Sequence, residues 1–526
     1  MPKVLVSDQL ALQGLEILER ARGMQVVHRP GLSPDELLTE IADADGLVIR
    51  SETKVTKDVL AAAKQLQVVG RAGIGVDNVD VPAATARGVV VMNTPGGNNV
   101  TTAEHAIALL VALARHIPQA TASMKQGRWE KSRFLGTELY HRTLGVIGLG
   151  RIGRIVADRA RGLGMKVIAY DPFLSEGAKL DVELVPLDAL YARADAITLH
   201  VPKTKDTTAL IGRAALAKMQ RGVLLVNAAR GGIIDEAALL EALDSGQVGG
   251  AALDVFEKEP PPPDHPLVRH ERVICTPHLG ASTEQAQVNV SVAIAEQVRD
   301  YLLTGLIGNA VNVPSISREA YGLVRPYVDL GIKLGRFQGQ LCPGKIDQIE
   351  VEYSGEAATL DVAPITVAVL KGLLESASDQ VNMVNAPVIA QERGIRVIES
   401  KSSRPSDFAS AITTRVSGCL ERLVAGAVFH GAQPRIVRVD DFMLEAIPEG
   451  PTLLLLNHDR PGVVGYVGTV LGEEGCNISR MQLALVRERS EACMLVNVDS
   501  APSAATMERL RALPHMISAQ LVDLGP

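Results

Sequence analysis

The sequence is poor in aromatic residues, which make up 3% of its 526 residues and include a single tryptophan. A core with so few large rings must be filled by Val, Leu, Ile and Ala. Cysteine is also scarce, and the five copies are scattered without metal-ligand spacing: Cys275, Cys342, Cys419, Cys476 and Cys493. An odd number of scattered cysteines argues against a disulfide framework and favours reduced thiols, as in the cytoplasm. No metal site is expected.

Positive charge is in deficit, with a formal net charge of −7. This balance argues against general binding to nucleic acid or a membrane surface, so any anionic ligand must be held by local Arg and Lys. No apolar run is long enough to cross a bilayer, and the chain opens on a strand-like Met-Pro-Lys-Val-Leu-Val instead of a signal peptide. The length predicts three or four domains in a cytoplasmic protein.

Two stretches of the chain alternate short β-branched runs with helix-like segments, a pattern typical of parallel sheets covered by helices on both faces. The first spans residues 3–95, and the second begins at residue 143. A long helical pattern at 101–117 follows the first stretch, and another at 282–305 ends the second. We therefore predict an α/β fold with two doubly wound domains of the Rossmann or flavodoxin type, one inserted in the other with a cleft between them. The outer domain would take residues 1–97 and 283–312, and the inserted domain residues 98–282.

The remaining chain gives two further segments after a linker around Pro314. Residues 315–450 mix strands and helices without a strong motif and predict an intervening α+β domain. Residues 451–526 show the order βαββαβ, which is typical of the ferredoxin-like unit.

The inserted domain opens with LGVIGLGRIGR, in which Gly148, Gly150 and Gly153 follow the GxGxxG spacing. A strand precedes this turn, an amphipathic helix follows it, and the next strand ends in Asp171. In this context the glycines allow a tight turn, close approach of a pyrophosphate and close helix packing. Asp171 would accept the ribose hydroxyls and repel a 2′-phosphate, which favours NAD over NADP. The alternative is a tight turn that binds no ligand.

Three chemically active side chains lie at or after the ends of later strands of the same domain: Arg230 in VNAARGG, Glu259 in DVFEKEP and His278 in TPHLGAST. Taken singly, each has a structural explanation as a surface cation, a solvated acid or a structural histidine. Together they can converge, because ligands bind at the carboxyl ends of parallel strands.

The convergence predicts oxidation of a hydroxyl group beside a carboxylate. His278 would take the hydroxyl proton while hydride leaves the same carbon for a nicotinamide. Glu259 would fix the tautomer of the imidazole and raise its pKa, and Arg230 would clamp the carboxylate.

These motifs resemble the signatures of the D-isomer-specific 2-hydroxyacid dehydrogenase family. The resemblance implies that Arg230, Glu259 and His278 are the catalytic residues and that NAD is the cofactor. The positions that would contact NAD by this resemblance, together with the glycine turn, are Gly148, Gly150, Arg151, Ile152, Gly153, Asp171, Val201, Ala228, Arg230, Asp254, His278, Gly280 and Ala281.

Within that family the chain is similar to the long-form members that oxidise 3-phospho-D-glycerate to 3-phosphohydroxypyruvate, the first step of serine synthesis. The likeness rests on VIRSETKV, VGRAGIGVDNVD, MNTPGGNNVTTAEH and the segment around Trp129 and Arg133, and it covers nearly the whole chain. It implies a substrate site that includes Arg230 and His278 together with Arg50, Ser51, Gly75 and Asn98. Alone, Arg50 could equally be a solvated cation. Trp129 and Arg133 would approach a neighbouring subunit.

The segment NHDRPGVVGYVGTVLGEEGCNIS resembles the ACT domain, a sensor of small molecules. The resemblance implies serine as a feedback inhibitor, held by Asn457, Asp459 and Asn477, although Asn457 stands where related proteins carry His or Tyr. An ACT fold used only for pairing of subunits is the alternative. Pairing through the long helices and through the tails would give a homotetramer, or a dimer if only one pairing forms.

Two rival functions remain open at this point. One is a dehydrogenase for another 2-hydroxy acid, such as 2-hydroxyglutarate or glycerate. The other is a co-repressor or scaffold that senses NAD, against which the intact His278 and Glu259 argue.

Overall fold

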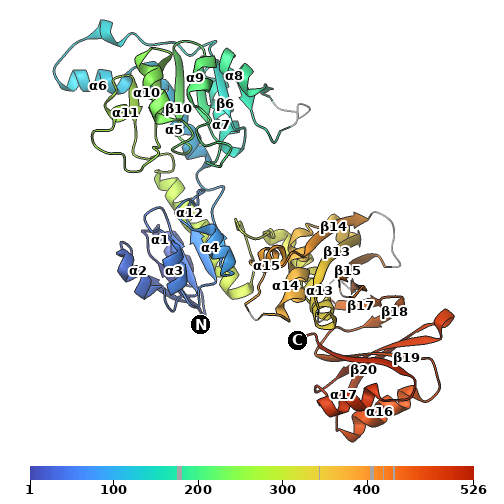
Figure 1. Cartoon of the computed structure of the whole chain (residues 1–526). Coiled ribbons are helices and arrows are strands. Elements are labelled where there is room, and N and C mark those ends of the chain that lie inside the picture. Colours follow the sequence, from blue (N-terminus) through green and yellow to red (C-terminus); the bar gives the residue numbers. More distant parts are fainter. Residues whose placement is uncertain (175–180, 343, 379, 403–407, 419, 430–432) are drawn as a thin grey trace. The chain divides into compact units, whose positions relative to one another are not determined.

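The structure, a computed structural model, describes residues 1–526 except 175–180, 343, 379, 403–407, 419 and 430–432 (Figure 1). By its internal contacts the chain divides into two compact units, and each is described by itself. The first unit consists of Met1–Gln9, Leu15–Asn93 and Ile294–Pro526, and the second of Leu10–Gly14 and Thr94–Ala293.

The first unit begins with a parallel five-stranded sheet in the order β2-β1-β3-β4-β5, the flavodoxin-like order. Its strands are β1 (Lys3–Val6), β2 (Gln25–His28), β3 (Gly46–Ile49), β4 (Val68–Arg71) and β5 (Val90–Met92). Its accompanying helices are α1 (Leu12–Glu19), α2 (Pro34–Glu40), α3 (Lys57–Ala62) and α4 (Val81–Ala86). The predicted alternation of strands and helices over residues 3–95 is confirmed.

Both faces of this sheet are buried. Helices α2, α3 and α4 cover one face, where they share a hydrophobic cluster with Leu5, Leu47 and Val69. The opposite face receives the later part of α12 (Glu284–Thr304) at the glycines of β3 and β4. A Cβ atom at Gly70 would lie 2.5 Å from a methyl group of Val298, so the helix sits at the closest approach that glycine allows.

The second unit holds a parallel seven-stranded sheet in the order β12-β11-β10-β9-β6-β7-β8. Strand order reverses between β9 and β6, which is the switch point where dinucleotides bind in such sheets. The strands are β6 (Thr143–Ile147), β7 (Lys166–Tyr170), β8 (Glu183–Leu184), β9 (Ala196–Leu199), β10 (Val223–Asn227), β11 (Val248–Leu253) and β12 (Val273–Cys275).

Helices cover both faces of the second sheet, as the alternating pattern predicts. One face packs against α5 (Asn99–Ala114) and α7 (Arg151–Gly162). The other packs against α8 (Leu187–Arg193), α9 (Arg213–Lys218), α10 (Glu236–Asp244) and α11 (Pro266–Arg269).

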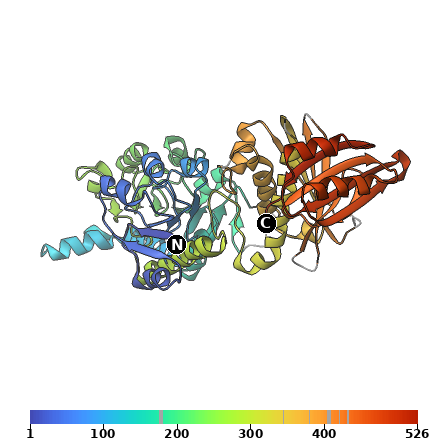
Figure 2. The ribbon, with the colours of Figure 1, turned by 90° about the horizontal axis from the view of Figure 1, so that it is seen from below.

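An arm projects from the second unit and carries Trp129 and Arg133, the residues expected to approach a neighbouring subunit. It contains α6 (Ile117–Lys125) and the 3-10 turn η1 (Lys131–Phe134), and α6 stands clear of the sheet in both views (Figure 2). The arm carries large apolar side chains in solvent, with Trp129 82% and Leu135 87% exposed.

The first unit continues into a six-stranded mixed sheet in the order β14-β13-β15-β16-β17-β18. Its strands are β13 (Ile346–Gly355), β14 (Arg396–Ser402), β15 (Ser410–Gly418), β16 (Arg422–Phe429), β17 (Gln433–Val439) and β18 (Phe442–Ala446). A pair of helices, α13 (Arg318–Leu341) and α14 (Ala363–Glu375), packs on one face, and η2 (Glu356–Thr359) and α15 (Ala386–Glu392) complete the segment.

The last segment has the predicted order βαββαβ. Its antiparallel sheet β20-β21-β19-β22 contains β19 (Pro451–His458), β20 (Ile478–Val486), β21 (Glu491–Val498) and β22 (Met516–Asp523). One face is covered by α16 (Val463–Glu473) and α17 (Ala504–Arg511), and η3 (Arg487–Arg489) follows β20. The other face joins the core of the six-stranded sheet through Leu454, Cys493 and Val522.

Three features of the described residues bear on the classes of protein considered. No single helix is long and apolar enough to cross a membrane. Only the pair α5 and α6, taken together, has the length and apolar composition of such a helix, and a bend of 63° separates the two. In the part of the chain that the structure describes, no cluster of His, Cys, Asp or Glu could hold a metal ion. The four cysteines in that part, Cys275, Cys342, Cys476 and Cys493, are free, and Cys419 lies outside the described residues.

Candidate functional site

The glycine turn lies at the switch point of the second sheet, between β6 and α7. Gly148 has φ 92°, and a Cβ atom there would lie 2.6 Å from the carbonyl oxygen of His200. A Cβ atom at Gly153 would lie 2.0 Å from the carbonyl oxygen of Gly148, whereas Gly150 faces open space. The first and third glycines are therefore required by backbone packing. The second leaves room at the amino end of α7, which has no side-chain cap, so an anion fits there.

Asp171 follows β7 beside this turn. Its carboxylate accepts the N–H groups of Leu149, at 2.9 Å, and of Phe173, at 3.0 Å. Each oxygen keeps a lone pair, because a carboxylate accepts about four hydrogen bonds. The acid is thus fixed next to the glycine turn with capacity left for a pair of ribose hydroxyls.

Other positions expected to contact NAD surround the same turn. Val201 follows β9, and one of its methyl carbons lies 2.8 Å from where a Cβ of Gly148 would be. Ala228 is buried directly after β10. The Arg151 guanidinium donates to the carbonyl oxygen of Pro95 at 3.1 Å, and Ile152 packs against the cluster beneath α5 and α7.

The imidazole of His278 and the carboxylate of Glu259 form a hydrogen-bonded pair, with Nδ1 2.7 Å from Oε2. The second carboxylate oxygen of Glu259 accepts the N–H of Phe256 at 3.1 Å. The bond from Glu259 is the largest cause that raises the pKa of His278 above its ordinary value, and burial opposes it. Burial alone would raise the pKa of Glu259, but the hydrogen bond from His278 and the positive charge of that ring outweigh it and lower the pKa. The geometry thus stabilises an imidazolium beside a carboxylate.

Arg230 lies in the turn after β10, close enough to His278 for its positive charge to lower the pKa of the ring. The side-chain amide of Asn227 shapes this turn: it donates to the carbonyl oxygen of Arg230 at 2.9 Å and accepts the N–H of Ala229 at 3.1 Å. A Cβ atom at Gly231 would lie 1.8 Å from the carbonyl oxygen of Phe256. Three strand ends therefore bring a guanidinium, a carboxylate and an imidazole into one neighbourhood.

A cavity of about 400 Å³ adjoins this neighbourhood. Its walls come mainly from the segments after β11 and β12 and are mostly apolar, with His278, Glu259, Asp254 and Thr276 as the polar groups. The side chain of His278 is 50% exposed, so a small molecule can reach the imidazole from this side.

His278 itself has a backbone φ of 54°, unusual for a residue with a side chain. The buried carboxylate of Asp254 holds the following residues by accepting the N–H groups of Leu279, at 2.7 Å, and Gly280, at 2.8 Å. Gly280 allows this contact, since its Cβ would lie 3.2 Å from that carboxylate. The next residue, Ala281, has its carbonyl oxygen bonded by the side chain of Gln287 at 3.2 Å.

In the first unit, Arg50 and Ser51 follow β3 in a loop that hydrogen bonds hold in place. The buried carboxylate of Asp8 accepts the N–H of Arg50 at 2.6 Å and both the N–H and the hydroxyl of Thr53. Asn78 donates to the carbonyl oxygens of Arg50 and Thr53. Gly75 lies in the loop after β4. Neither Asp8 nor Asn78 was singled out from the sequence.

Asn98 belongs to the second unit, where it precedes α5. Its side chain makes no capping bond to the helix, and its buried Oδ1 atom has no hydrogen-bond partner among the described residues. The structure therefore places Arg50, Ser51 and Gly75 in one unit, and Asn98 with Arg230, Glu259 and His278 in the other.

Two family models match the chain. Residues 107–280 match the NAD binding domain of the D-isomer specific 2-hydroxyacid dehydrogenases, and residues 323–440 match the intervening domain of D-3-phosphoglycerate dehydrogenase. Over 99% of its length the chain is 44% identical to the whole D-3-phosphoglycerate dehydrogenase of Archaeoglobus fulgidus. It is 40% identical to all of the D-3-phosphoglycerate dehydrogenase of Bacillus subtilis, over its full length.

The chain belongs to the D-3-phosphoglycerate dehydrogenase family. It is accordingly an NAD-dependent oxidoreductase, and the observed glycine turn and Asp171 fit that cofactor. The expectation of this family and of NAD is confirmed.

Solved structures resemble part of the dehydrogenase chain. The TT0316 protein of Thermus thermophilus is 36% identical with a TM-score of 0.55, and the match covers 59% of this chain and 99% of that one. A D-lactate dehydrogenase of Aquifex aeolicus, solved with NAD and lactic acid, is 27% identical with a TM-score of 0.53, and the match covers 59% of this chain and 100% of that one.

The residues expected to bind serine lie in the last segment of the dehydrogenase. Asn457, near the end of β19, donates to the carbonyl oxygen of His458 at 2.8 Å, and its buried Oδ1 atom has no partner among the described residues. The N–H of Asp459 donates to the carbonyl oxygen of Ser490 at 2.8 Å. The N–H of Asn477 donates to Asp499 at 3.0 Å.

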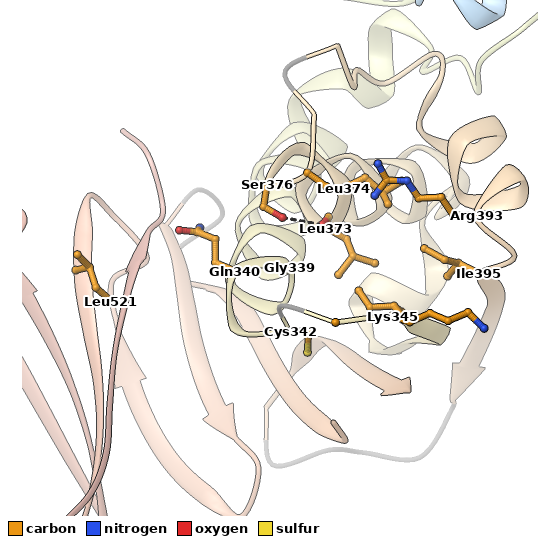
Figure 3. A pocket seen from close by; sticks show the side chains of 13 residues that line it. Gly339, Gln340, Cys342, Lys345, Leu373, Leu374, Ser376, Arg393, Ile395 and Leu521 are labelled. Carbon is orange, nitrogen blue, oxygen red and sulfur yellow. Dashed lines mark hydrogen bonds between the residues drawn. The ribbon is translucent and has the colours of Figure 1, made fainter. Parts of the chain in front are cut away.

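A cavity of about 700 Å³ lies away from these residues, at the ends of α13 and α14. Figure 3 shows Lys345 and Arg393 at its rim, with Leu373 and Ser376 joined by a hydrogen bond. The amide of Gln340, which also faces it, is bonded to the backbone of Asp523 through both its nitrogen and its oxygen.

Proposed function

We propose that the chain oxidises 3-phospho-D-glycerate to 3-phosphohydroxypyruvate with NAD, the first step of serine synthesis in the cytoplasm. The observation that carries the proposal is the 2.7 Å bond between His278 and Glu259 at the carboxyl edge of a dinucleotide-binding sheet. Full-length relatives named D-3-phosphoglycerate dehydrogenase support the choice of substrate.

Each of the three side chains has one task in this reaction. His278 removes the proton of the substrate hydroxyl through Nε2, because Nδ1 is engaged by Glu259. Glu259 stabilises the imidazolium that results, and Arg230 clamps the substrate carboxylate and polarises the carbonyl as it develops. When bound, NAD supplies the acceptor for the hydride that leaves the same carbon.

We assign the cofactor to the glycine turn and its surroundings. The pyrophosphate would lie at the amino end of α7, near Gly150, Arg151 and Ile152, and Asp171 would bind the adenosine ribose. Val201, Ala228, Asp254, Gly280 and Ala281 would line the path toward the nicotinamide.

We assign the anionic groups of the substrate to polar residues at strand ends. Arg50, Ser51 and Gly75 present a guanidinium, a hydroxyl and backbone groups in a loop that Asp8 and Asn78 hold in place. The unpartnered Oδ1 atom of Asn98 is an acceptor suited to a substrate hydroxyl.

The direct test measures NADH production from 3-phosphoglycerate by the purified chain. The His278→Ala variant should lose about 10²–10⁴-fold in kcat, the range for a lost general base. Unchanged turnover by that variant would refute the assignment of the base.

A second comparison separates the proposed substrate from other 2-hydroxy acids. Solved neighbours on the same scaffold include a glyoxylate reductase and a D-lactate dehydrogenase, so the fold alone does not select the acid. Turnover is therefore compared on 3-phosphoglycerate, glycerate and 2-hydroxyglutarate. Equal kcat/KM with and without the phosphate would remove the role given to Arg50.

We further propose that the last segment is an ACT domain that binds serine. The free acceptor on the buried Asn457 supports a polar ligand there, with Asp459 for its ammonium group and Asn477 for its other polar atoms. Calorimetric titration with serine, and NADH production with and without it, test the proposal. Asn457→Leu should abolish binding, and an unchanged heat of binding would exclude this site.

We also propose that the chain assembles as a homotetramer. The exposed Trp129 and Leu135 of the projecting arm are apolar surface that a second subunit would cover. Light scattering at several protein concentrations measures the number of subunits in the assembly. Substitution of both residues by Ser should leave a smaller species.

A further inference from the structure

The strained backbone at His278 raises the question of what holds it. A non-glycine residue with φ 54° persists only where its surroundings fix it. The segment Thr276–Gly280 is anchored mainly to Asp254, which accepts the N–H of His278 through its main-chain carbonyl at 2.9 Å and the next two N–H groups through its carboxylate. The position of the imidazole therefore depends on the position of one buried carboxylate.

Two side chains hold that carboxylate in turn. The hydroxyl of Thr276 lies 2.6 Å from Oδ1 of Asp254, and Nε2 of His105 lies 3.2 Å from the same oxygen. Nε2 also lies 3.2 Å from the hydroxyl oxygen of Thr276. Since the single hydroxyl hydrogen of Thr276 is donated to Asp254, the nitrogen of His105 must be the donor to both oxygens. Burial would raise the pKa of Asp254, but the bonds from His105, Thr276 and Leu279 lower it.

Helix α5 presents a second anchor on the same face as His105. Thr102, three residues earlier, donates its hydroxyl to the carbonyl oxygen of Gly280 at 2.9 Å. Residues three apart lie on one face of a helix, so α5 holds both ends of the segment around His278.

We infer that His105 is a positioning residue for the dehydrogenase reaction: it donates to Asp254 and Thr276 and so fixes the backbone that aims His278. The inference rests on the proposed role of His278 as the base. His105 does not touch the reacting atoms, and its effect is transmitted through Asp254.

A simple packing role is the competing explanation, because His105 also lines an apolar cavity of about 630 Å³ between α5, α6 and β12. His105→Leu keeps the bulk of the side chain and removes the donor, whereas His105→Gln keeps an N–H donor at a similar reach. Glu104→Gln, at the neighbouring exposed position of α5, is the matched control.

The experiment first follows deuterium exchange of the peptide 276–282 in the full chain, without substrate. In His105→Leu the amides of Leu279 and Gly280 should exchange at least about tenfold faster, since their acceptor is no longer fixed. His105→Gln and Glu104→Gln should match the wild type. Equal protection in His105→Leu would overturn the inference.

Kinetics then test the consequence for the reaction. His105→Leu should lower kcat about 10–100-fold, the scale of a small misplacement of a catalytic group, with little change in the KM for 3-phosphoglycerate. His105→Gln should recover most of the loss. Losses of equal size in the Leu and Gln variants would show a packing role and overturn the inference.

A cycle with Thr276→Val checks the route through Asp254. If both residues act through that carboxylate, the double variant should be hardly worse than the poorer single variant. Fully additive losses would contradict a shared route. A wild-type chain inactive on 3-phosphoglycerate would refute the proposed function instead, and the exchange measurement would still decide the role of His105.

Discussion

At the scale of single residues, we expect the hydrogen-bonded pair of His278 and Glu259 to set the pH range of the reaction. If His278 is the base, as proposed, oxidation needs its neutral form, so kcat/KM should fall as the pH drops through its raised pKa. Glu259→Gln removes the largest cause of that shift. We expect the acid limb of the kcat/KM profile to move to lower pH while kcat drops about 10²–10⁴-fold.

The measurement is the pH profile of NADH production by both proteins. Glu257→Gln, an exposed acid two residues away, is the control and should leave the profile in place. An acid limb that stays where it is in Glu259→Gln would mean that another group titrates there.

We expect cofactor choice to depend on one residue, Asp171. Asp171→Ala removes the proposed acceptor of the ribose hydroxyls and the charge that repels a 2′-phosphate. Because a hydrogen bond to a charged group contributes roughly 1.5–3 kcal/mol, discrimination between NAD and NADP should fall at least about tenfold. Steady-state kinetics with each cofactor measure the ratio. Asp158→Ala, an exposed change on α7, should leave it unaltered.

The sequence identifies the reactive side chains of the candidate site better than the residues that hold them in place. Gly148, Asp171, Arg230, Glu259 and His278 stand out because motif spacing and strand ends mark them. Asp8, Thr102 and His105 do not, since their partners are tens to hundreds of residues away and only folding brings them together. Their residue types are common in ordinary helices and strand ends.

At the scale of elements, the pair α13 and α14 depends on glycine. A Cβ atom at Gly335 would lie 2.0 Å from the carbonyl oxygen of Val369, and one at Gly372 would lie 2.0 Å from that of Ile332. The two backbones thus touch directly. Gly335→Ala should lower the free energy of unfolding by about 1–3 kcal/mol, the usual cost of overpacking.

Denaturant unfolding of the segment containing α13 measures this cost. Gly322→Ala in the same helix is the control, because nothing lies within 4 Å of a Cβ atom there. That change should stabilise the helix by up to about 1 kcal/mol, through the higher helix propensity of alanine. Equal effects at the two positions would refute the contact.

The same helix shows why part of the fold escapes sequence analysis. Apart from the two-residue β8, the strands of the two parallel sheets were predicted, because β-branched runs and turn residues agree with the final structure. Helix α13 spans 24 residues although it contains Pro326 and several glycines, which locally disfavour helix. Packing against α14 and the six-stranded sheet overrides that local preference, and no local signal reports such a partner.

At the scale of the whole molecule, the hydrophobic clusters divide near residue 316. The cluster on one face of the first sheet draws on Leu5–Val91, and the two clusters of the second sheet on residues 103–274. The first sheet is completed by Asn312, whose side chain accepts the N–H of Val91 at 2.9 Å and donates to the carbonyl oxygen of Val89. The core around α13 and α14 begins only at Ile316.

A fragment of residues 1–317 should therefore fold and retain turnover. It keeps the three clusters of the parallel sheets and loses few bonds, such as those from Tyr321 to Thr304 and from Asn382 to Gly88. The relative from Thermus thermophilus, whose chain is covered almost entirely by 59% of this one, is a folded protein of that size. We expect kcat within about threefold of the full chain.

The fragment also tests where serine acts. It lacks Asn457, Asp459 and Asn477, so serine should have no effect on its NADH production, while the full chain is inhibited. Circular dichroism and light scattering establish that the fragment is folded before kinetics are compared. A folded fragment that serine still inhibits would move the effector site into residues 1–317, and a folded but inactive one would mean that the later segments support the chemistry itself.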